Sequence, residues 1–252
     1  MVREKDYIPE TTKVRLIEIG VPAGKHGLEA IAGLFPAEFN IRALGLNAAD
    51  LARVLIHFVE QKIVSLPNRK GPVCARKVGP GWHACHFYQD YDQLLDIIAP
   101  YVAAGLKNGE ACLWVMPAAV TNEAAGRALG KHVDRIEACI EAGQLEMLAH
   151  PDWYLDAAGR LKSFEEIGAA LLAKQDLALA RGFKFLRAAG DTGWVSCTEQ
   201  SKEFIDYENK VNAALQSTQV AAVCTYRADV TADELIAIVN SHQDAMYTPA
   251  EA

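Results

Sequence analysis

The sequence predicts an α/β protein with a mostly parallel sheet flanked by helices on both faces, preceded by a small N-terminal α/β extension. Strand and helix patterns alternate from residue 83 onward, and such βαβ units form parallel sheets. The run Ala111–Met116 (ACLWVM) is apolar throughout, as expected for a strand buried on both faces. A proline- and glycine-rich segment, Ser65–Gly81, separates the two parts. We therefore expect two domains, residues 1–75 and 76–252.

The first domain shows two strand patterns and two helix patterns. Lys13–Gly20 (KVRLIEIG) is rich in β-forming residues and predicts a strand, as does Phe39–Leu44. Gly24–Phe35 predicts a helix that ends before Pro36. Ala48–Val64 predicts an apolar helix with a broad hydrophobic face, suited to dimerisation or to binding a partner.

The second domain shows five strand patterns separated by helices. The predicted strands are His83–Tyr88, Ala111–Met116, Gln144–Ala149, Phe183–Ala188 and Val220–Tyr226. The predicted helices are Tyr91–Ala104, Asn122–Ala142 after a Thr121 cap, a helix from the Ser163/Glu166 capping box to Gly182, Thr198–Leu215, and a helix from the Thr231/Glu234 capping box to Asn240.

Composition limits the classes of function. The formal net charge is −7, which argues against direct DNA binding. The six cysteines are scattered without paired short spacings, as expected for free thiols in a reducing compartment. The N-terminus has no secretory signal pattern, and no apolar stretch is long enough to span a membrane. We expect a cytoplasmic protein.

Ligands of open parallel sheets bind outside the carboxyl ends of the strands. The residues that the sequence places there combine aromatic rings with a few polar groups, which suits a pocket for a small organic molecule. They are Phe87, Tyr88, Gln89, Met116, Pro117, His150, Pro151, Asp152, Trp153, Ala189, Gly190, Asp191, Trp194, Tyr226 and Arg227.

A phosphate-binding loop is poorly supported. Gly20–Gly27 (GVPAGKHG) is one residue shorter than a Walker A loop, and His26 stands where a serine or threonine should be. The turn Met116–Glu123 (MPAAVTNE) has neither glycine nor lysine. Ordinary turns are the favoured interpretation of both segments.

The segment His83–His86 (HACH) offers sulfur and imidazole. In a strand, His83 and Cys85 share one face. These side chains suit zinc, iron or copper, but a structural zinc site needs four ligands. Cys197, Cys224 or His150 would have to complete it. The alternative is a buried polar pair in the core.

Arg187 lies within an apolar strand and needs an acceptor if it is buried. Asp191 and Glu208 are the candidate partners. A structural ion pair and a charge that anchors a ligand are equally consistent with this pattern.

Several spaced motifs resemble one known family. The chain contains His83-x-Cys85-x-x-Tyr88, a Gly105–Val115 segment that includes Trp114, Arg187-x-x-Gly190-Asp191-x-x-Trp194, Tyr207-Glu208 and Cys224-x-Tyr226. In order and spacing, these motifs resemble the MEDS sensory domain over residues 83–247. The resemblance implies a RecA-like fold that has lost its Walker A loop, and the sensing of one-carbon or hydrocarbon-derived compounds. The ligand-site candidates are His83, Cys85, Tyr88, Trp114, Arg187, Asp191, Trp194, Glu208, Cys224 and Tyr226.

These observations favour a sensor that binds a small organic ligand and signals to a regulatory protein partner or within a homodimer, rather than an enzyme. Residues 1–75 show no convincing helix-turn-helix, so we expect no direct DNA binding by this chain. One alternative is a metal- or thiol-dependent enzyme that uses His83 and Cys85. Another is a degenerate nucleotide-binding scaffold that regulates partners.

Overall fold

The computed structural model describes residues 7–18, 21, 26–35, 41–60, 78–194 and 201–246. The chain divides into two compact units. The first, the helical unit, comprises residues 1–75, 228–240 and 246–252, and the second, the sheet unit, comprises residues 76–227 and 241–245. The division into functional domains at residue 75 stays a prediction.

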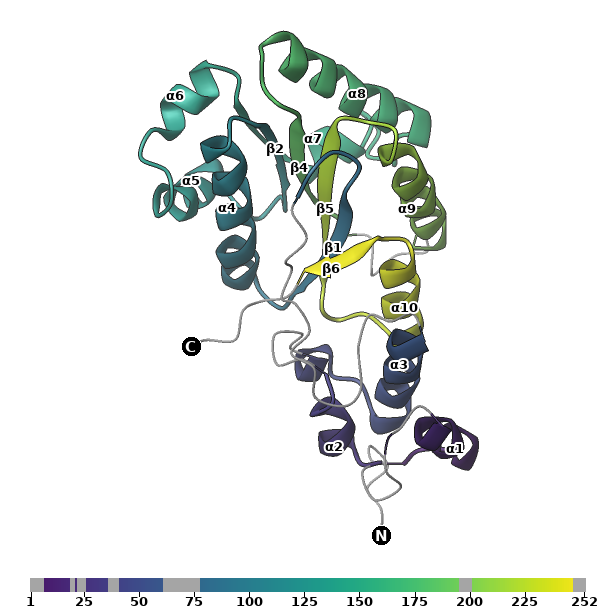
Figure 1. Cartoon of the computed structure of the whole chain (residues 1–252). Helices are drawn as coiled ribbons and strands as arrows, with labels where there is room; N and C mark the ends of the chain where they lie inside the picture. The colour runs from purple at the N-terminus through teal and green to yellow at the C-terminus, as the bar shows by residue number, and fades with distance from the viewer. Residues whose placement is uncertain are drawn as a thin grey trace. The chain divides into compact units, whose positions relative to one another are not determined.

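The sheet unit is built on a six-stranded sheet in the order β3-β2-β4-β5-β1-β6 (Figure 1). The pairs β1–β5, β4–β5, β2–β4 and β2–β3 are all parallel, which confirms the predicted fold class. The strands are β1 (His83–Tyr88), β2 (Ala111–Met116), β3 (Leu145–Ala149), β4 (Leu186–Asp191), β5 (Val220–Arg227) and β6 (Asp244–Met246).

Helices cover both faces of this sheet. Figure 1 shows α4 and α5 on one side and α8 and α9 on the other. All six residues of the apolar strand β2 are buried, because helices cover both faces of the sheet. The helices of the sheet unit are α4 (Tyr91–Lys107), α5 (Asn122–Gly130), α6 (Ile136–Glu141), α7 (His150–Tyr154), α8 (Phe164–Ala180) and α9 (Ser201–Leu215).

The helix starts follow from local capping chemistry. The Thr121 hydroxyl accepts a hydrogen bond from the Ala124 amide at 3.1 Å, and Ser163 and Glu166 form the predicted capping box. Thr231 and Glu234 form a second capping box before α10 (Ala232–Asn240). These three predicted helix starts are confirmed.

The helical unit differs from the sequence prediction. Its described elements are α1 (Glu10–Glu18), α2 (Leu28–Ala32), a 3₁₀ helix labelled η4 (Ile41–Leu44), α3 (Ala48–Glu60) and α10. The predicted strands Lys13–Gly20 and Phe39–Leu44 are therefore wrong where the structure describes these residues. A helix satisfies its own backbone hydrogen bonds, whereas a strand needs a partner edge, and the described part of this unit supplies none. Ile41 and Leu44 are both buried, and this spacing fits one 3₁₀ turn.

Two further predictions need correction in the sheet unit. The predicted helix Asn122–Ala142 is interrupted, because α5 ends at Gly130 and α6 begins at Ile136. Glycine is a poor helix former, which favours a break at this point. The strand predicted at Phe183–Ala188 lies three residues further along, at Leu186–Asp191. The amide of Phe183 donates to the carbonyl of Ala178 in α8, and the amide of Lys184 donates to the carbonyl of Gly109 in the turn before β2.

A buried ion pair lies on the face of the sheet that α4 covers. Arg187 Nε donates to Glu110 Oε2 at 2.5 Å, and both side chains are almost fully buried. The guanidinium also lies 4.7 Å from the centre of the Tyr101 ring. The predicted partners, Asp191 and Glu208, are wrong, because Glu110, immediately before the neighbouring strand β2, reaches Arg187 instead. The residue thus makes a closed structural ion pair.

We expect Gly105→Ala to destabilise the protein, although glycine-to-alanine changes inside helices usually stabilise by about 0.5–1 kcal/mol. A Cβ atom at Gly105 would lie 2.7 Å from Arg187 Cδ and Nε and from Cys112 Sγ. Displacing this ion pair should cost a net 1–3 kcal/mol, to order of magnitude, measured by urea denaturation. Gly168→Ala in α8 is the matched control, since nothing lies within 4 Å of a Cβ there. Equal effects of the two changes would contradict the close packing at Gly105.

Candidate functional site

The structure distributes the ten predicted site residues among three places. Five gather on the sheet face that α9 covers: His83, Cys85, Glu208, Cys224 and Tyr226. Three lie at the carboxyl ends of the strands: Tyr88, Asp191 and Trp194. The remaining two, Trp114 and Arg187, lie in the core on the opposite face of the sheet.

The first group is brought together by the pairing of β1 with β5. His83 is paired with Ala222, Cys85 with Cys224, and Phe87 with Tyr226. Paired residues of parallel strands point to the same face, so these side chains all face α9. Glu208 of α9 then lies directly over this part of the sheet.

We call His83, Glu208, Cys224 and His242 the Glu208 cluster. Glu208 Oε2 lies 3.4 Å from His83 Nε2, 3.6 Å from His242 Nε2 and 3.7 Å from Cys224 Sγ. His83 Nε2 also lies 3.4 Å from Cys224 Sγ, and the two imidazole ring centres are 4.1 Å apart. All four side chains are buried, so their polar atoms lie together away from bulk solvent.

Electrostatics keep the Glu208 carboxylate charged. Burial raises its pKa, but the hydrogen bond from His83 and the charges of His242 and His83 outweigh burial and lower the pKa below the ordinary value. Burial and the neighbouring Glu208 raise the pKa of the Cys224 thiol well above its ordinary value. The cluster therefore contains one charged carboxylate, that of Glu208. Beside it, the two imidazoles and the Cys224 thiol can each donate a proton or a lone pair of electrons.

The composition of this cluster differs from the metal pair predicted from sequence. Each of its four side chains offers one ligand atom, and these atoms lie within 4.8 Å of one another. Cys85 is not among the four, although it is paired with Cys224. His242 was not predicted as part of the site. It follows the last predicted helix, which ends at Asn240, and nothing in the local sequence indicates where the chain runs after that helix.

A second group, the strand-end cluster, consists of Tyr88, His150, Asp191 and Trp194. The Tyr88 hydroxyl donates to Asp191 Oδ1 at 2.8 Å, and His150 Nδ1 lies 3.6 Å from Asp191 Oδ2. The rings of His150 and Trp194 stack with centres 5.5 Å apart. Tyr88 and Asp191 end β1 and β4, and His150 and Trp194 follow β3 and β4, as the carboxyl-end rule predicts.

Asp191 is the electrostatic centre of the strand-end cluster. Burial raises its pKa to about 6, although the hydrogen bonds from Tyr88, Gly193 and Thr225 oppose the shift. Burial also lowers the pKa of His150. A carboxyl group with this pKa can accept or donate a proton near neutral pH, which suits recognition of a small polar ligand.

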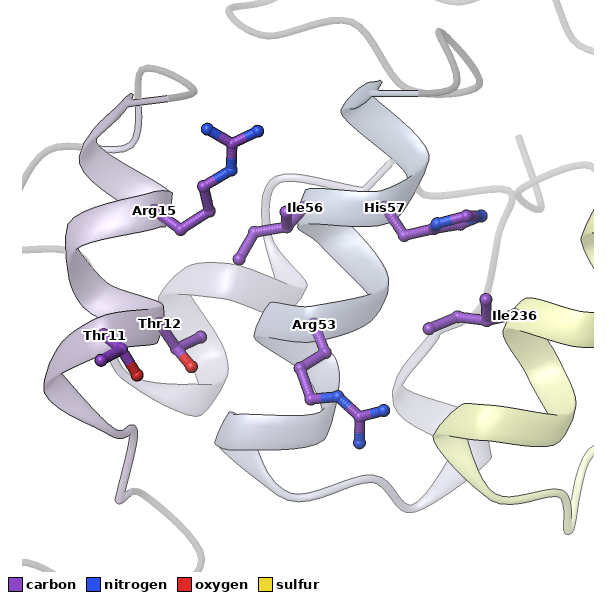
Figure 2. A pocket seen from close by; sticks show the side chains of 7 residues that line it. All are labelled: Thr11, Thr12, Arg15, Arg53, Ile56, His57 and Ile236. Atoms are coloured by element: carbon purple, nitrogen blue, oxygen red, sulfur yellow. The ribbon is translucent and has the colours of Figure 1, made fainter.

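The helical unit contains a cavity of about 330 Å³, shown in Figure 2. It lies between α1, α3 and α10 and is lined by Thr11, Thr12, Arg15, Arg53, Ile56, His57 and Ile236. Arg53 pairs with Asp50 and Asp233, and His57 Nε2 lies 2.7 Å from Asn240 Oδ1. These polar side chains thus serve contacts between α3 and α10.

The fold and the two clusters define an α/β domain that gathers titratable and aromatic groups around a parallel sheet. Residues 82–243 match the family model described as MEDS, the methanogen/methylotroph, DcmR sensory domain. The chain belongs to this family of sensory domains. No curated protein matches the chain.

A solved structure that resembles this chain is the KaiC-like protein PH0186 from the hyperthermophilic archaeon Pyrococcus horikoshii OT3. The two chains are 12% identical over 59% of this chain, with a TM-score of 0.42. The match spans 62% of that protein's length. Within the described residues, no helix of our chain combines the length and the apolar content needed to cross a membrane.

We expect Asp191→Asn to remove one source of pH dependence from stability. Asp191 binds a proton more tightly in the fold, at a pKa of about 6, than its ordinary value of 3.8. Its contribution is full below about pH 4 and is lost as pH rises towards about 6, by about 3 kcal/mol at most. The variant should therefore gain stability relative to wild type across this window, as measured by urea denaturation at each pH. Asp134→Asn, at an exposed position, is the matched control; identical pH profiles for wild type and Asp191→Asn would contradict the raised pKa.

Proposed function

We propose that this chain is a cytoplasmic sensor that binds a small organic ligand, one-carbon or hydrocarbon-derived, at the strand-end cluster and signals to a regulatory partner. Membership of a sensory-domain family supports the general role. The observation that carries the choice of site is Asp191, a buried carboxyl group whose pKa is raised to about 6 at the carboxyl end of a parallel strand. Among the described residues, Cys112, Cys139 and Cys224 form no disulfide, which supports a reducing compartment.

The surroundings of Asp191 favour a small ligand. A Cβ atom on Gly190 would lie 2.5 Å from the Tyr154 hydroxyl, and one on Gly193 would lie 2.5 Å from the Tyr88 hydroxyl. The two tyrosine hydroxyls therefore fill the space that larger residues would take at these positions. Aromatic rings beside one carboxyl group offer apolar contact together with a single directional hydrogen bond, which is the recognition that a small organic molecule needs.

The path of the chain suggests how binding is communicated. β5 ends at Arg227, and Ala228 begins the segment that belongs to the helical unit. Thr192, beside Asp191, donates its amide and its hydroxyl to the Thr225 carbonyl near that exit. A ligand that binds Asp191 differently in two states would shift this strand end. We propose that residues 1–75 pass the change to a regulatory protein or to a second copy of the chain.

We expect a thermal-shift screen of small organic compounds to identify a ligand that stabilises the wild-type chain. At a concentration one hundred times its dissociation constant, it should add about 2.7 kcal/mol to the free energy of unfolding. Asp191→Asn and Tyr88→Phe should weaken binding at least tenfold by calorimetry, because each removes a polar group of the site. Asp134→Asn should bind as wild type does.

Several results would count against this proposal. A ligand whose affinity is the same in wild type and Asp191→Asn would place binding elsewhere. Turnover of a compound, lost in Cys85→Ala, would favour the enzyme interpretation instead. Stabilisation by ATP alone would favour a nucleotide-binding scaffold.

A further inference from the structure

We propose that the Glu208 cluster is a binding site for one divalent transition-metal ion, with zinc as the best match. The four ligand atoms are His83 Nε2, His242 Nε2, Cys224 Sγ and one carboxylate oxygen of Glu208. This inference goes beyond the proposed ligand sensor and does not depend on the strand-end cluster.

Four of the six spacings between the ligand atoms match a tetrahedral metal centre, and all six lie within 4.8 Å. Hydrogen bonds from imidazole to carboxylate measure about 2.7–3.2 Å, yet Glu208 Oε2 lies 3.4 Å from His83 Nε2 and 3.6 Å from His242 Nε2. Tetrahedral bonds of about 2.0–2.3 Å to nitrogen, oxygen and sulfur place ligand atoms about 3.3–3.6 Å apart. The distances to Cys224 Sγ, 3.4 Å from His83 and 3.7 Å from Glu208, also agree with such a tetrahedron.

The outer nitrogens of both histidines are engaged in the way that metal-binding histidines require. His83 Nδ1 lies 3.3 Å from Asn212 Oδ1, and His242 Nδ1 lies 3.1 Å from Ser241 Oγ. With an ion bound, His83 can donate its Nδ1 proton to the Asn212 amide oxygen, which leaves the lone pair of Nε2 for the metal.

Charge balance favours a divalent ion. Glu208 and a Cys224 thiolate supply two negative charges, and two neutral imidazoles supply none. A divalent cation therefore makes the buried centre neutral, which avoids the cost of an uncompensated charge away from water. Two nitrogens, one sulfur and one oxygen in tetrahedral arrangement are typical of zinc.

The ligands come from segments that lie far apart in the sequence. β1 supplies His83, α9 supplies Glu208, β5 supplies Cys224, and residues 241–245 supply His242. His242 follows the segment 228–240, which belongs to the helical unit. Four protein ligands leave no open position for a substrate, so the ion holds α9 and the returning chain to the sheet rather than carrying out chemistry.

The test uses the full chain, purified with a reductant and a chelator and then titrated with Zn²⁺ or Co²⁺ in the absence of any organic ligand. We expect one tightly held ion per chain. The Co²⁺ form should show the thiolate charge-transfer band and the intense visible bands of tetrahedral coordination. Cys224→Ser should abolish the charge-transfer band, whereas Cys85→Ser, the matched control on the neighbouring strand, should retain it.

Asn212→Ala tests the outer contact to His83 without removing a ligand. It should weaken Zn²⁺ binding by about 10–100-fold while the spectrum of the fully loaded Co²⁺ form stays tetrahedral. X-ray absorption of the wild-type Zn²⁺ form needs no variant, and it should show one sulfur at about 2.3 Å with three nitrogen or oxygen ligands at about 2.0–2.2 Å.

Three outcomes would overturn the metal site. One is a wild-type chain that binds neither Zn²⁺ nor Co²⁺ more tightly than a Cys224→Ser chain. Another is a charge-transfer band that survives Cys224→Ser or is lost in Cys85→Ser. The third is a wild-type absorption spectrum with no sulfur in the first shell. None of these bears on whether an organic ligand binds at Asp191.

Discussion

The register between β1 and β5 is the constraint on which both clusters depend. Because His83 is paired with Ala222 and Cys85 with Cys224, the alternate residues of these central strands face α9 together. The same pairing places Tyr88 opposite Arg227 at the carboxyl end of the sheet, where Tyr88 reaches Asp191. A shift of one residue would exchange the two faces and separate both groups.

The two faces of the sheet accommodate buried charge in different ways. On the α4 face, Arg187 and Glu110 neutralise each other in direct contact, and Gly105 leaves room for the guanidinium stem. On the α9 face, the partners of Glu208 within the described part of the chain are two imidazoles, a thiol and a tyrosine. Breaking a buried ion pair is costly, so the first arrangement is a fixed part of the fold. The second consists of groups whose charge a proton or a metal ion could balance.

The parts of the fold that follow from local chemistry could be predicted from the sequence. Three such features depend only on residues within one short segment, and the structure agrees with all three. They are the apolar run of β2, the Thr121 cap and the Ser163/Glu166 capping box. The strand predicted at Lys13–Gly20 failed because β-forming residues alone do not provide a neighbouring edge, and α1 occupies most of that segment.

The sites could be predicted only in part, for a related reason. His83, Cys224 and Glu208 were recognised as candidates, but their meeting point depends on strand order and on the helix that covers the strands. His242 shows the limit most clearly, because it lies more than one hundred and fifty residues from His83 in the sequence and yet its ring lies tilted against that of His83, with ring centres 4.1 Å apart. No periodicity in the sequence encodes such a contact. Arg187 shows the reverse case: its charge fitted a structural ion pair and a ligand anchor equally well, and only the ion pair with Glu110 could be read from the fold, while a role in ligand binding stays a prediction.

The turns that follow β1 and β2 determine what kind of ligand the carboxyl edge of the sheet can accept. Helix starts bind phosphate when their backbone amides are left free to face an anion. At the start of α4, the Asp90 carboxylate accepts a hydrogen bond from the Gln93 amide at 2.8 Å. At the start of α5, the Thr121 hydroxyl accepts one from the Ala124 amide at 3.1 Å. Asp92 and Glu123 add negative charge to the same first turns. These carboxylates repel a phosphate group. In the proposed function, recognition at this edge therefore falls to side chains such as Asp191, His150 and Trp194, and the proposed ligand is a neutral or cationic small molecule rather than a nucleotide.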